Sequence, residues 1–245
     1  MIEVSAVSWP IVVGLVVLLT AVQSVFGVGL LVFGTPMLLL LGLPFSQVLI
    51  LLLPCSITVS ALQVATTGGF TLDPMRRRFL VITLPAVGVA TLGTLTWGSP
   101  SHIRLVVGAM LIVSALLRVG GSRRRFDAGV HRYQRPLLLL LGLVHGASNL
   151  GGGLLATLVG SSYQESVMVR RQIAFCYGAM ASIQILVLLS SGDRAVSAMS
   201  LVLPLLAAAT YFSVGQRAFR KAGHFGYQLA LSVMIFGVGM LLVAT

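Results

Sequence analysis

Apolar runs, separated by short polar or glycine-rich breaks, occupy nearly the whole chain. Stretches without a charged side chain cover residues 9–67, 79–101, 105–117, 136–144, 172–192 and 225–245. A helix that crosses a bilayer needs about 20 predominantly apolar residues, so this pattern predicts membrane-spanning helices. We therefore expect an all-α integral membrane protein of about 8–10 helical segments, with residues 1–245 forming a single transmembrane domain.

Glycines divide the first apolar run of each half of the chain. Residues 9–26 and 28–42 form one pair of segments, and residues 136–148 and 151–162 form another. At ~1.5 Å per residue, residues 136–148 reach only ~20 Å, which is less than the ~30 Å hydrocarbon core. Each pair therefore predicts a re-entrant hairpin, in which two half-length helices enter and leave on one side. Because residues 9–26 reach ~27 Å, a full crossing of that segment stays open.

Residues other than Leu and Val recur at a nearly constant offset, which indicates an internal duplication. The pairs are Gly27-Val28-Gly29 with Gly151-Gly152-Gly153 at 124, His102 with His224 at 122, Cys55 with Cys176 and Gln63 with Gln184 at 121, and Leu84-Pro85 with Leu203-Pro204 at 119. We interpret the chain as two repeats, residues 9–119 and 136–245, joined by the basic linker 120–135. Chance similarity in a low-complexity membrane sequence is the alternative.

The distribution of basic residues favours repeats that face opposite ways. If each repeat is a hairpin plus three spans, 14 of the 16 basic residues fall on the cytoplasmic side and only Arg104 and Arg194 lie outside. Eight simple spans with parallel halves leave ten inside and six outside. The positive-inside rule prefers the first arrangement. We therefore predict two inverted repeats in a multi-pass protein of the cell inner (plasma) membrane.

Composition narrows the function classes further. With 57% hydrophobic and 9% charged residues, the chain is not a soluble globule, in which roughly a quarter of residues are charged. The net charge of +11 lies in short loops, so no nucleic-acid binding is expected. Glu3 without basic residues or a cleavage site argues against a removable signal peptide. Two cysteines alone complete neither a zinc site nor a disulfide scaffold, and we expect no metal and no cofactor.

The glycine breaks predict the binding site. The first N–H groups of a helix lack intrahelical partners and carry about half a positive charge, so they attract anions. Gly27 and Gly29, like Gly151 to Gly153, let a ligand approach the backbone because no Cβ intervenes. Inverted repeats with broken helices are typical of secondary transporters. Close helix packing is the alternative role of these glycines.

The two glycine motifs resemble those of a known family. The stretches FGVGLLVFGTPMLLLLGLP (26–44) and GLVHGASNLGGGLLATLVG (142–160) look like the paired motifs of the TauE/SafE family of sulfite and organosulfur-anion permeases. Chain length, duplicated halves and the basic linker match along the whole chain. The resemblance implies a transporter of sulfite, sulfonates, sulfoacetate or thiosulfate that works by proton-coupled export. Val28, Leu30 and Thr157-Leu158 depart from the family pattern and leave the substrate open.

Polar residues near the breaks extend the candidate site. Hydroxyls and amides can bind sulfonate oxygens without the desolvation cost of a buried arginine. His145, an ionisable group inside an apolar segment, is the candidate proton carrier. The candidate substrate-binding residues are Gln23, Ser24, Gly27, Gly29, Cys55, Gln63, Ser148, Asn149, Gly151, Gly152, Gly153, Cys176 and Gln184. For the cysteines and serines, apolar packing and hydrogen bonds to their own helix are the alternatives.

Other roles are open to a membrane protein of this kind. His145 and Ser148 could form a hydrolase pair, but no glycine-flanked nucleophile turn or second base accompanies them, so we expect no enzyme. An anion channel or an accessory subunit would need no coupling residue. Glu165 is close to Arg170 in sequence, which predicts an ion pair in a loop. The expected partners are a small anion, membrane lipid and protons, and the sequence leaves a homodimer open.

Overall fold

The computed structural model describes residues 8–68, 73–99, 132–163, 165–192 and 198–221, and these ranges contain helices and no strand. The predicted all-α class is therefore confirmed. Five helical stretches are long and apolar enough to cross a membrane, as expected for a multi-pass membrane protein: Trp9–Phe26, Phe45–Thr66, Pro74–Trp97, Val167–Ser190 and Met199–Phe219. Most of the linker, His102, His224 and the predicted spans 105–117 and 225–245 lie outside the described residues.

The first half of the chain forms a broken pair of helices followed by two long spans. Its elements are α1 (Trp9–Phe26), α2 (Leu30–Leu40), α3 (Phe45–Thr66), α4 (Pro74–Arg78), the π-helical turn η1 (Phe79–Thr83) and α5 (Leu84–Trp97). The last three run on without interruption as one span. With only 11 residues, α2 is about 16 Å long and is too short to cross a bilayer by itself.

The second half repeats this order. Its elements are α8 (Gln134–Ser148), α9 (Gly152–Ser162), α10 (Ser166–Ser190), α11 (Ala198–Thr210), the π-helical turn η2 (Tyr211–Gly215) and α12 (Gln216–Lys221). Like α2, α9 has only 11 residues. A short helix therefore follows the first break in each half.

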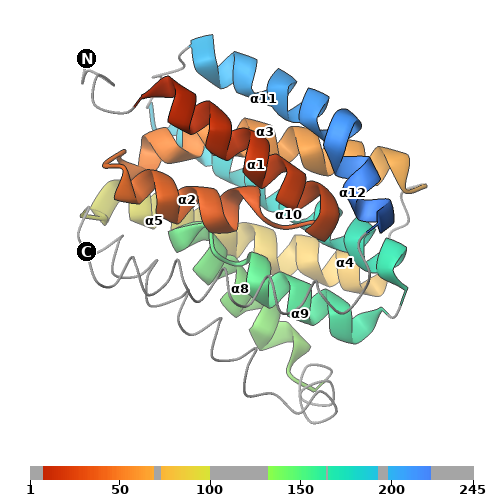
Figure 1. Cartoon of the computed structure of the whole chain (residues 1–245). Coiled ribbons are helices and arrows are strands. Elements are labelled where there is room, and N and C mark those ends of the chain that lie inside the picture. The colour runs from red at the N-terminus through yellow and green to blue at the C-terminus, as the bar shows by residue number, and fades with distance from the viewer. Residues whose placement is uncertain (1–7, 69–72, 100–131, 164, 193–197, 222–245) are drawn as a thin grey trace.

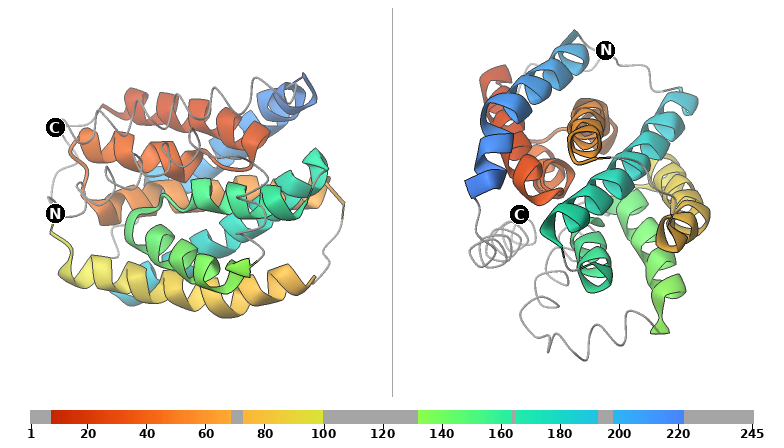
Figure 2. Two further views of the ribbon diagram at one scale, coloured as in Figure 1. Left: turned by 90° about the horizontal axis from the view of Figure 1, so that it is seen from below. Right: turned by 90° about the vertical axis from the view of Figure 1, so that its right-hand side faces the viewer.

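The first helix of each half packs against the other half. Helices α3 and α10 pack together at the centre, while α8 lies on α5 of the first half and α1 lies on α11, η2 and α12 of the second (Figure 1). Helices α3 and α10 run in opposite directions, because Arg171 near the start of α10 bonds the Gly68 carbonyl after α3, whereas Gly178 further along α10 faces Ser60 earlier in α3. Figure 2 shows α1 and α8 running in opposite directions, and the turns that follow them lie close together, since a Cβ on Gly152 would be 3.2 Å from Val28 Cγ1.

Glycine and threonine bring α8 close to α5. The Thr83 and Thr91 hydroxyls donate to the carbonyls of Leu138 and Gly146, at 3.0 and 3.1 Å. A Cβ on Gly142 would lie 2.6 Å from the Thr83 carbonyl oxygen, and one on Gly146 would lie 2.5 Å from the carbonyl of its neighbour on α5. Such small-residue contacts are typical of helix packing in lipid, where backbones approach closely. They fix the α8–α9 pair on the first half.

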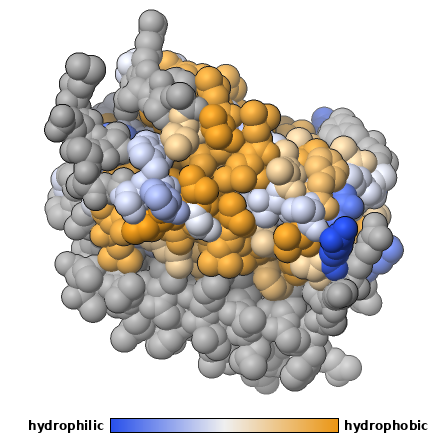
Figure 3. All heavy atoms as spheres, turned by 45° about the horizontal axis from the view of Figure 1, so that its top comes forward, coloured by the Kyte–Doolittle hydropathy of each residue, from blue (hydrophilic) through white to orange (hydrophobic). Residues whose placement is uncertain are grey.

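Apolar side chains are abundant on the outside as well as in the core. Leu18 on α1 and Val89 on α5 are 59% and 70% exposed, and Leu205 on α11 is 72% exposed. Figure 3 shows apolar side chains across the middle of one face. Basic segments, in contrast, gather at the end where α3 stops and α10 starts, because Arg78 bonds Gln134 and Arg170 stacks on Phe219. We call this the basic end.

Candidate functional site

Both broken helices end in the same way. Helix α1 is followed by Gly27 with φ +76°, whose N–H donates to the Gln23 carbonyl at 2.7 Å. Helix α8 is followed by Asn149 with φ +66°, whose N–H donates to the His145 carbonyl at 2.7 Å. The left-handed conformation suits Gly first and Asn next, which explains the two cap residues.

The two broken helix pairs correspond at an offset of 122 residues. The two caps, Gly27 and Asn149, are 122 residues apart, and so are Leu30 and Gly152, the first residues of α2 and α9. The glycine motifs had paired at 124. The difference arises because the N-cap of α9 is Gly151, the first glycine of its motif, whereas the N-cap of α2 is Gly29, the second glycine of its motif.

The short helices touch near their starts. A Cβ on Gly152 would lie 2.6 Å from Val32 Cγ2 and 3.2 Å from both Val28 Cγ1 and Tyr177 Cε2. The Asn149 side-chain amide donates to the Thr35 hydroxyl at 3.0 Å. The two helix starts are thus adjacent, and they pass side by side with valines between them.

The first polar cluster consists of Gln23, Ser56, Ser60 and Gln63 and fastens the α1–α2 turn to α3. Gln23 Nε2 lies 3.3 Å from the hydroxyls of Ser56 and Ser60, and Gln23 Oε1 accepts the N–H of Leu30 at 3.2 Å. Gln63 Nε2 donates to the Gln23 carbonyl at 2.8 Å and to the carbonyl of the next residue at 3.2 Å. Gln23 therefore already binds one of the free N–H groups of α2.

The second polar cluster consists of His145, Asn149, Tyr177 and Gln184 and occupies the corresponding place in the other half. Gln184 Nε2 donates to the His145 carbonyl at 3.4 Å, much as Gln63 does to Gln23. The rings of His145 and Tyr177 meet edge to face with centroids 5.6 Å apart. All four side chains are buried.

Polar atoms of the second polar cluster lack hydrogen-bond partners. Among the described residues, none bonds His145 Nδ1 or Nε2, Asn149 Oδ1, Tyr177 OH or Gln184 Oε1. In the first polar cluster, Gln63 Oε1 is the one side-chain atom without a hydrogen-bond partner among the described residues. A buried polar group without a partner costs about 1–3 kcal/mol. This concentration therefore marks the second polar cluster as the stronger candidate for a ligand site.

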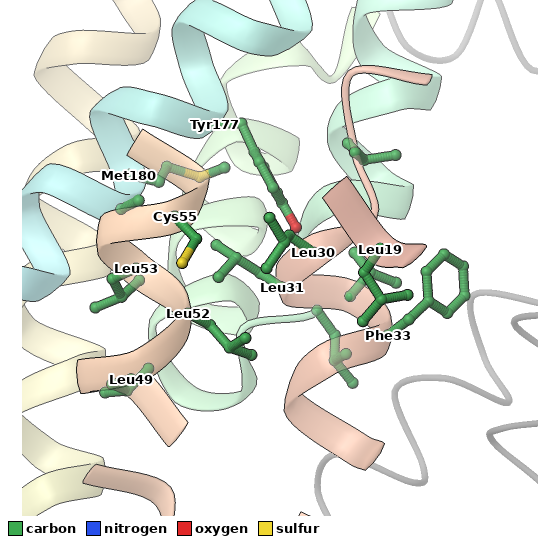
Figure 4. Packing of buried hydrophobic residues seen from close by; sticks show 14 of the residues in the cluster. Leu19, Leu30, Leu31, Phe33, Leu49, Leu52, Leu53, Cys55, Tyr177 and Met180 are labelled. Carbon is green, nitrogen blue, oxygen red and sulfur yellow. The ribbon is translucent and has the colours of Figure 1, made fainter. Parts of the chain in front are cut away.

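Tyr177 is the site residue that the sequence analysis missed. Its hydroxyl points toward the start of α2 at Leu30 and Leu31 (Figure 4), and it faces the N–H groups of Leu31 and Val32 without hydrogen-bond geometry. Its position in the sequence, one residue after Cys176, could have identified it. At the offset of 121 that pairs the cysteines, Tyr177 corresponds to Ser56, which binds Gln23.

The hydroxyl and thiol groups of the remaining predicted residues mostly bond their own helices. The Ser24 hydroxyl donates to the Thr20 carbonyl at 2.7 Å, and Cys55 Sγ lies 3.2 Å from the Leu51 carbonyl. Cys176 is buried one residue before Tyr177. The Ser148 hydroxyl donates to the Val144 carbonyl at 2.7 Å, so it does not bond His145. These contacts match the packing alternatives that the sequence left open.

The predicted glycines allow close contacts within the turns. A Cβ on Gly27 would lie 2.9 Å from Ile173, and one on Gly29 would lie 2.9 Å from the Gln23 backbone nitrogen. A Cβ on Gly151 would lie 3.0 Å from His145 Nδ1. Gly153 is buried in the first turn of α9. These turns have no room for side chains, which is why glycines occupy them.

A polar network at the basic end ties α9 to the span that begins with α4. The Asp73 carboxylate accepts from the Tyr163 hydroxyl, from Gln172 Nε2 at 2.6 Å and from the Arg76 N–H at 2.7 Å. Burial raises the pKa of Asp73, but these hydrogen bonds outweigh it and hold that pKa below its usual value. Burial and the nearby carboxylate raise the pKa of Tyr163 to about 12, so it remains a hydroxyl donor.

The predicted ion pair of Glu165 with Arg170 is wrong. Arg170 lies within α10 and is only 5% exposed, with its guanidinium carbon 3.9 Å from the centre of the Phe219 ring. Glu165 is exposed before the helix. Aromatic rings from η2 and α12 stack on the guanidinium instead, a contact between distant segments that sequence proximity could not reveal.

Comparisons of the chain with protein-family models, with curated proteins and with solved structures find no match.

Proposed function

We propose that this chain is a secondary transporter of small sulfur-containing anions and that the second polar cluster binds the substrate. The observation that carries the proposal is the group of buried, unpartnered polar atoms beside two broken helices. Polar groups inside a membrane protein are costly and usually serve a ligand or an ion. The resemblance of the glycine motifs to the TauE/SafE permeases supplies the substrate class.

The donors of this site suit an oxyanion. Tyr177 offers one O–H beside the first N–H groups of α2, and a neutral imidazole of His145 offers one N–H. When His145 takes up a proton it offers two, and its charge neutralises that of the anion. Binding of the anion and of the proton therefore favour each other, which is a physical basis for coupling.

The hydrogen-bond acceptors of the second polar cluster restrict which anions fit. Because Gln184 Nε2 faces the His145 carbonyl, its oxygen Oε1 is fixed as an acceptor without a partner. A bare oxyanion would be repelled there, whereas an anion that also carries an O–H or N–H group would be bound. Hydrogensulfite and hydroxy- or amino-substituted sulfonates meet this condition.

The arrangement of the helices supports alternating access between inverted repeats. Helices α3 and α10 run in opposite directions, as do α1 and α8 (Figure 2), and the turns after α1 and α8 meet inside the molecule. Re-entrant hairpins that enter from opposite sides of the membrane have this geometry. The basic end, with Arg76 to Arg78 and Arg170-Arg171, is then cytoplasmic.

Flux measurements test the proposal. Purified protein in liposomes should move labelled sulfite or isethionate with saturable kinetics, faster under a pH gradient, and acetate far less. Protein-free liposomes give the background. Replacing His145 by Gln should abolish the stimulation by the gradient. A flux that rises linearly with concentration would identify a channel, and the absence of flux for every sulfur anion would reject transport.

A further inference from the structure

Arg170 is a buried cation, and two of its three guanidinium nitrogens have no hydrogen-bond partner in the described residues. Its Nε and Nη2 atoms have no hydrogen-bond partner there, although the side chain is only 5% exposed. The rings of Phe219 and Tyr211 lie 3.9 and 6.0 Å from the guanidinium carbon. Aromatic faces attract a cation, but a ring above the guanidinium plane does not replace hydrogen-bond acceptors in that plane.

No carboxylate of the described residues neutralises this charge. The described acidic residues are Asp73 and Glu165. Asp73 is bound by Tyr163, Gln172 and the backbone of Arg76, and Glu165 is exposed. Since a guanidinium keeps its proton in proteins, the charge of Arg170 needs an anion from elsewhere.

The position of Arg170 connects it with the second polar cluster. Arg170, Tyr177 and Gln184 follow one another at intervals of seven residues on α10, so they lie along one face at steps of about 10 Å. Each carries a buried atom without a partner in the described residues. The α1–α2 turn lies beside the same part of α10, because a Cβ on Gly27 would be 3.5 Å from the Arg170 carbonyl.

We propose that Arg170 binds a small oxyanion at the basic end. This second binding site, which we call the Arg170 station, lies about 10 Å from Tyr177 along α10. This inference takes its ligand from the proposed transport function. The anion is held by the N–H groups of Nε and Nη2, and the flanking rings exclude water. The same chemistry fits the phosphate of an anionic lipid headgroup, which the experiment must distinguish from a soluble anion.

Binding to the purified protein tests this station. In neutral detergent, sulfite should raise the thermal unfolding midpoint of the wild type, and Arg170→Gln should weaken the apparent affinity at least about tenfold, as expected when a charge-assisted hydrogen bond is lost. Arg170→Lys should be intermediate, because it keeps the charge but lacks the planar fork. Arg171→Gln is the matched control, since Arg171 already bonds the Gly68 carbonyl.

Thermal unfolding in nanodiscs distinguishes a soluble anion from a lipid headgroup. One set of nanodiscs contains phosphatidylglycerol and the other contains phosphatidylcholine alone. Stabilisation by sulfite that Arg170→Gln loses identifies the soluble anion. Stabilisation by phosphatidylglycerol alone that Arg170→Gln loses identifies the lipid headgroup. Equal responses of the wild type and both Arg170 variants would overturn the proposal.

Flux separates this inference from the proposed function. If wild-type protein transports sulfite and Arg170→Gln does so with an unchanged KM, the station is rejected and transport stands. If sulfite binds in an Arg170-dependent manner but does not cross the membrane, the station stands and transport is rejected.

Discussion

The two polar clusters occupy equivalent places in the two halves. In the first, nearly all side-chain polar atoms have hydrogen-bond partners, whereas in the second several have none among the described residues. In the first polar cluster, Gln23 bonds Ser56, Ser60 and the start of α2. In the second, His145 corresponds to Gln23 but neither of its ring nitrogens has a partner in the described residues. The first polar cluster thus holds helices together, and the second is the one that we propose binds a ligand.

The largest expected effect comes from filling the contact between α2 and α9. Gly152→Leu should reduce transport to about a tenth of wild type or less, because the first carbon added already lies 2.6 Å from Val32. The measurement is flux in liposomes at equal protein content. Gly160→Leu, on the same helix with nothing within 4 Å of a Cβ, should transport normally. Loss of activity in both variants would separate the effect from this contact.

Removing one hydroxyl from each cluster compares the two halves most directly. Tyr177→Phe should raise the KM for sulfite about fivefold, as expected for one lost hydrogen bond, and leave the unfolding midpoint unchanged. Ser56→Ala should leave KM unchanged and destabilise the protein by about 1 kcal/mol, because Gln23 loses a partner. A raised KM in Ser56→Ala together with a lowered stability in Tyr177→Phe would mean that the first polar cluster binds the substrate and the second holds the helices together.

The two glutamines give a smaller contrast. Gln63→Leu should lower the unfolding midpoint more than Gln184→Leu, since Gln63 donates to two carbonyls, the closer at 2.8 Å, and Gln184 to one at 3.4 Å. Each lost bond is worth about 1 kcal/mol. For transport we expect the opposite order, with the larger rise in KM in Gln184→Leu. Equal effects on both measurements would mean that the clusters are functionally alike.

Acidification should give the smallest effect, through Asp73, which ties Tyr163 after α9 to α4. The folded-state pKa of Asp73 is lowered, so its contribution to stability is complete above the unfolded value near 4 and disappears as the pH falls through the folded value. For a partly exposed group it amounts to less than about 1 kcal/mol. Thermal unfolding between pH 6 and pH 3 should show this loss in the wild type, and Asp73→Asn should reduce it. An identical pH profile in the variant would show that Asp73 does not contribute.

Much of the fold and part of the site could be predicted from local signals. The helix breaks follow from Gly27, Gly29 and the run from Gly151, because these residues favour turns and leave no side chain to pack. Gln63 and Gln184 were found by their shared offset. Tyr177 was missed because a tyrosine in an apolar helix resembles a packing residue until the distant start of α2 is placed against its hydroxyl.

By itself, the sequence determined an all-helical membrane protein with two broken helix pairs, since hydrophobic length and glycine conformation act over a few neighbouring residues. Only the tertiary structure decided which polar groups find partners. Gln23 forms hydrogen bonds with serines from α3, whereas His145 has only a ring contact with Tyr177. Arg170 is buried by aromatic rings from η2 and α12. Hydrogen-bond satisfaction depends on contacts between distant segments, which a pattern along one chain does not contain.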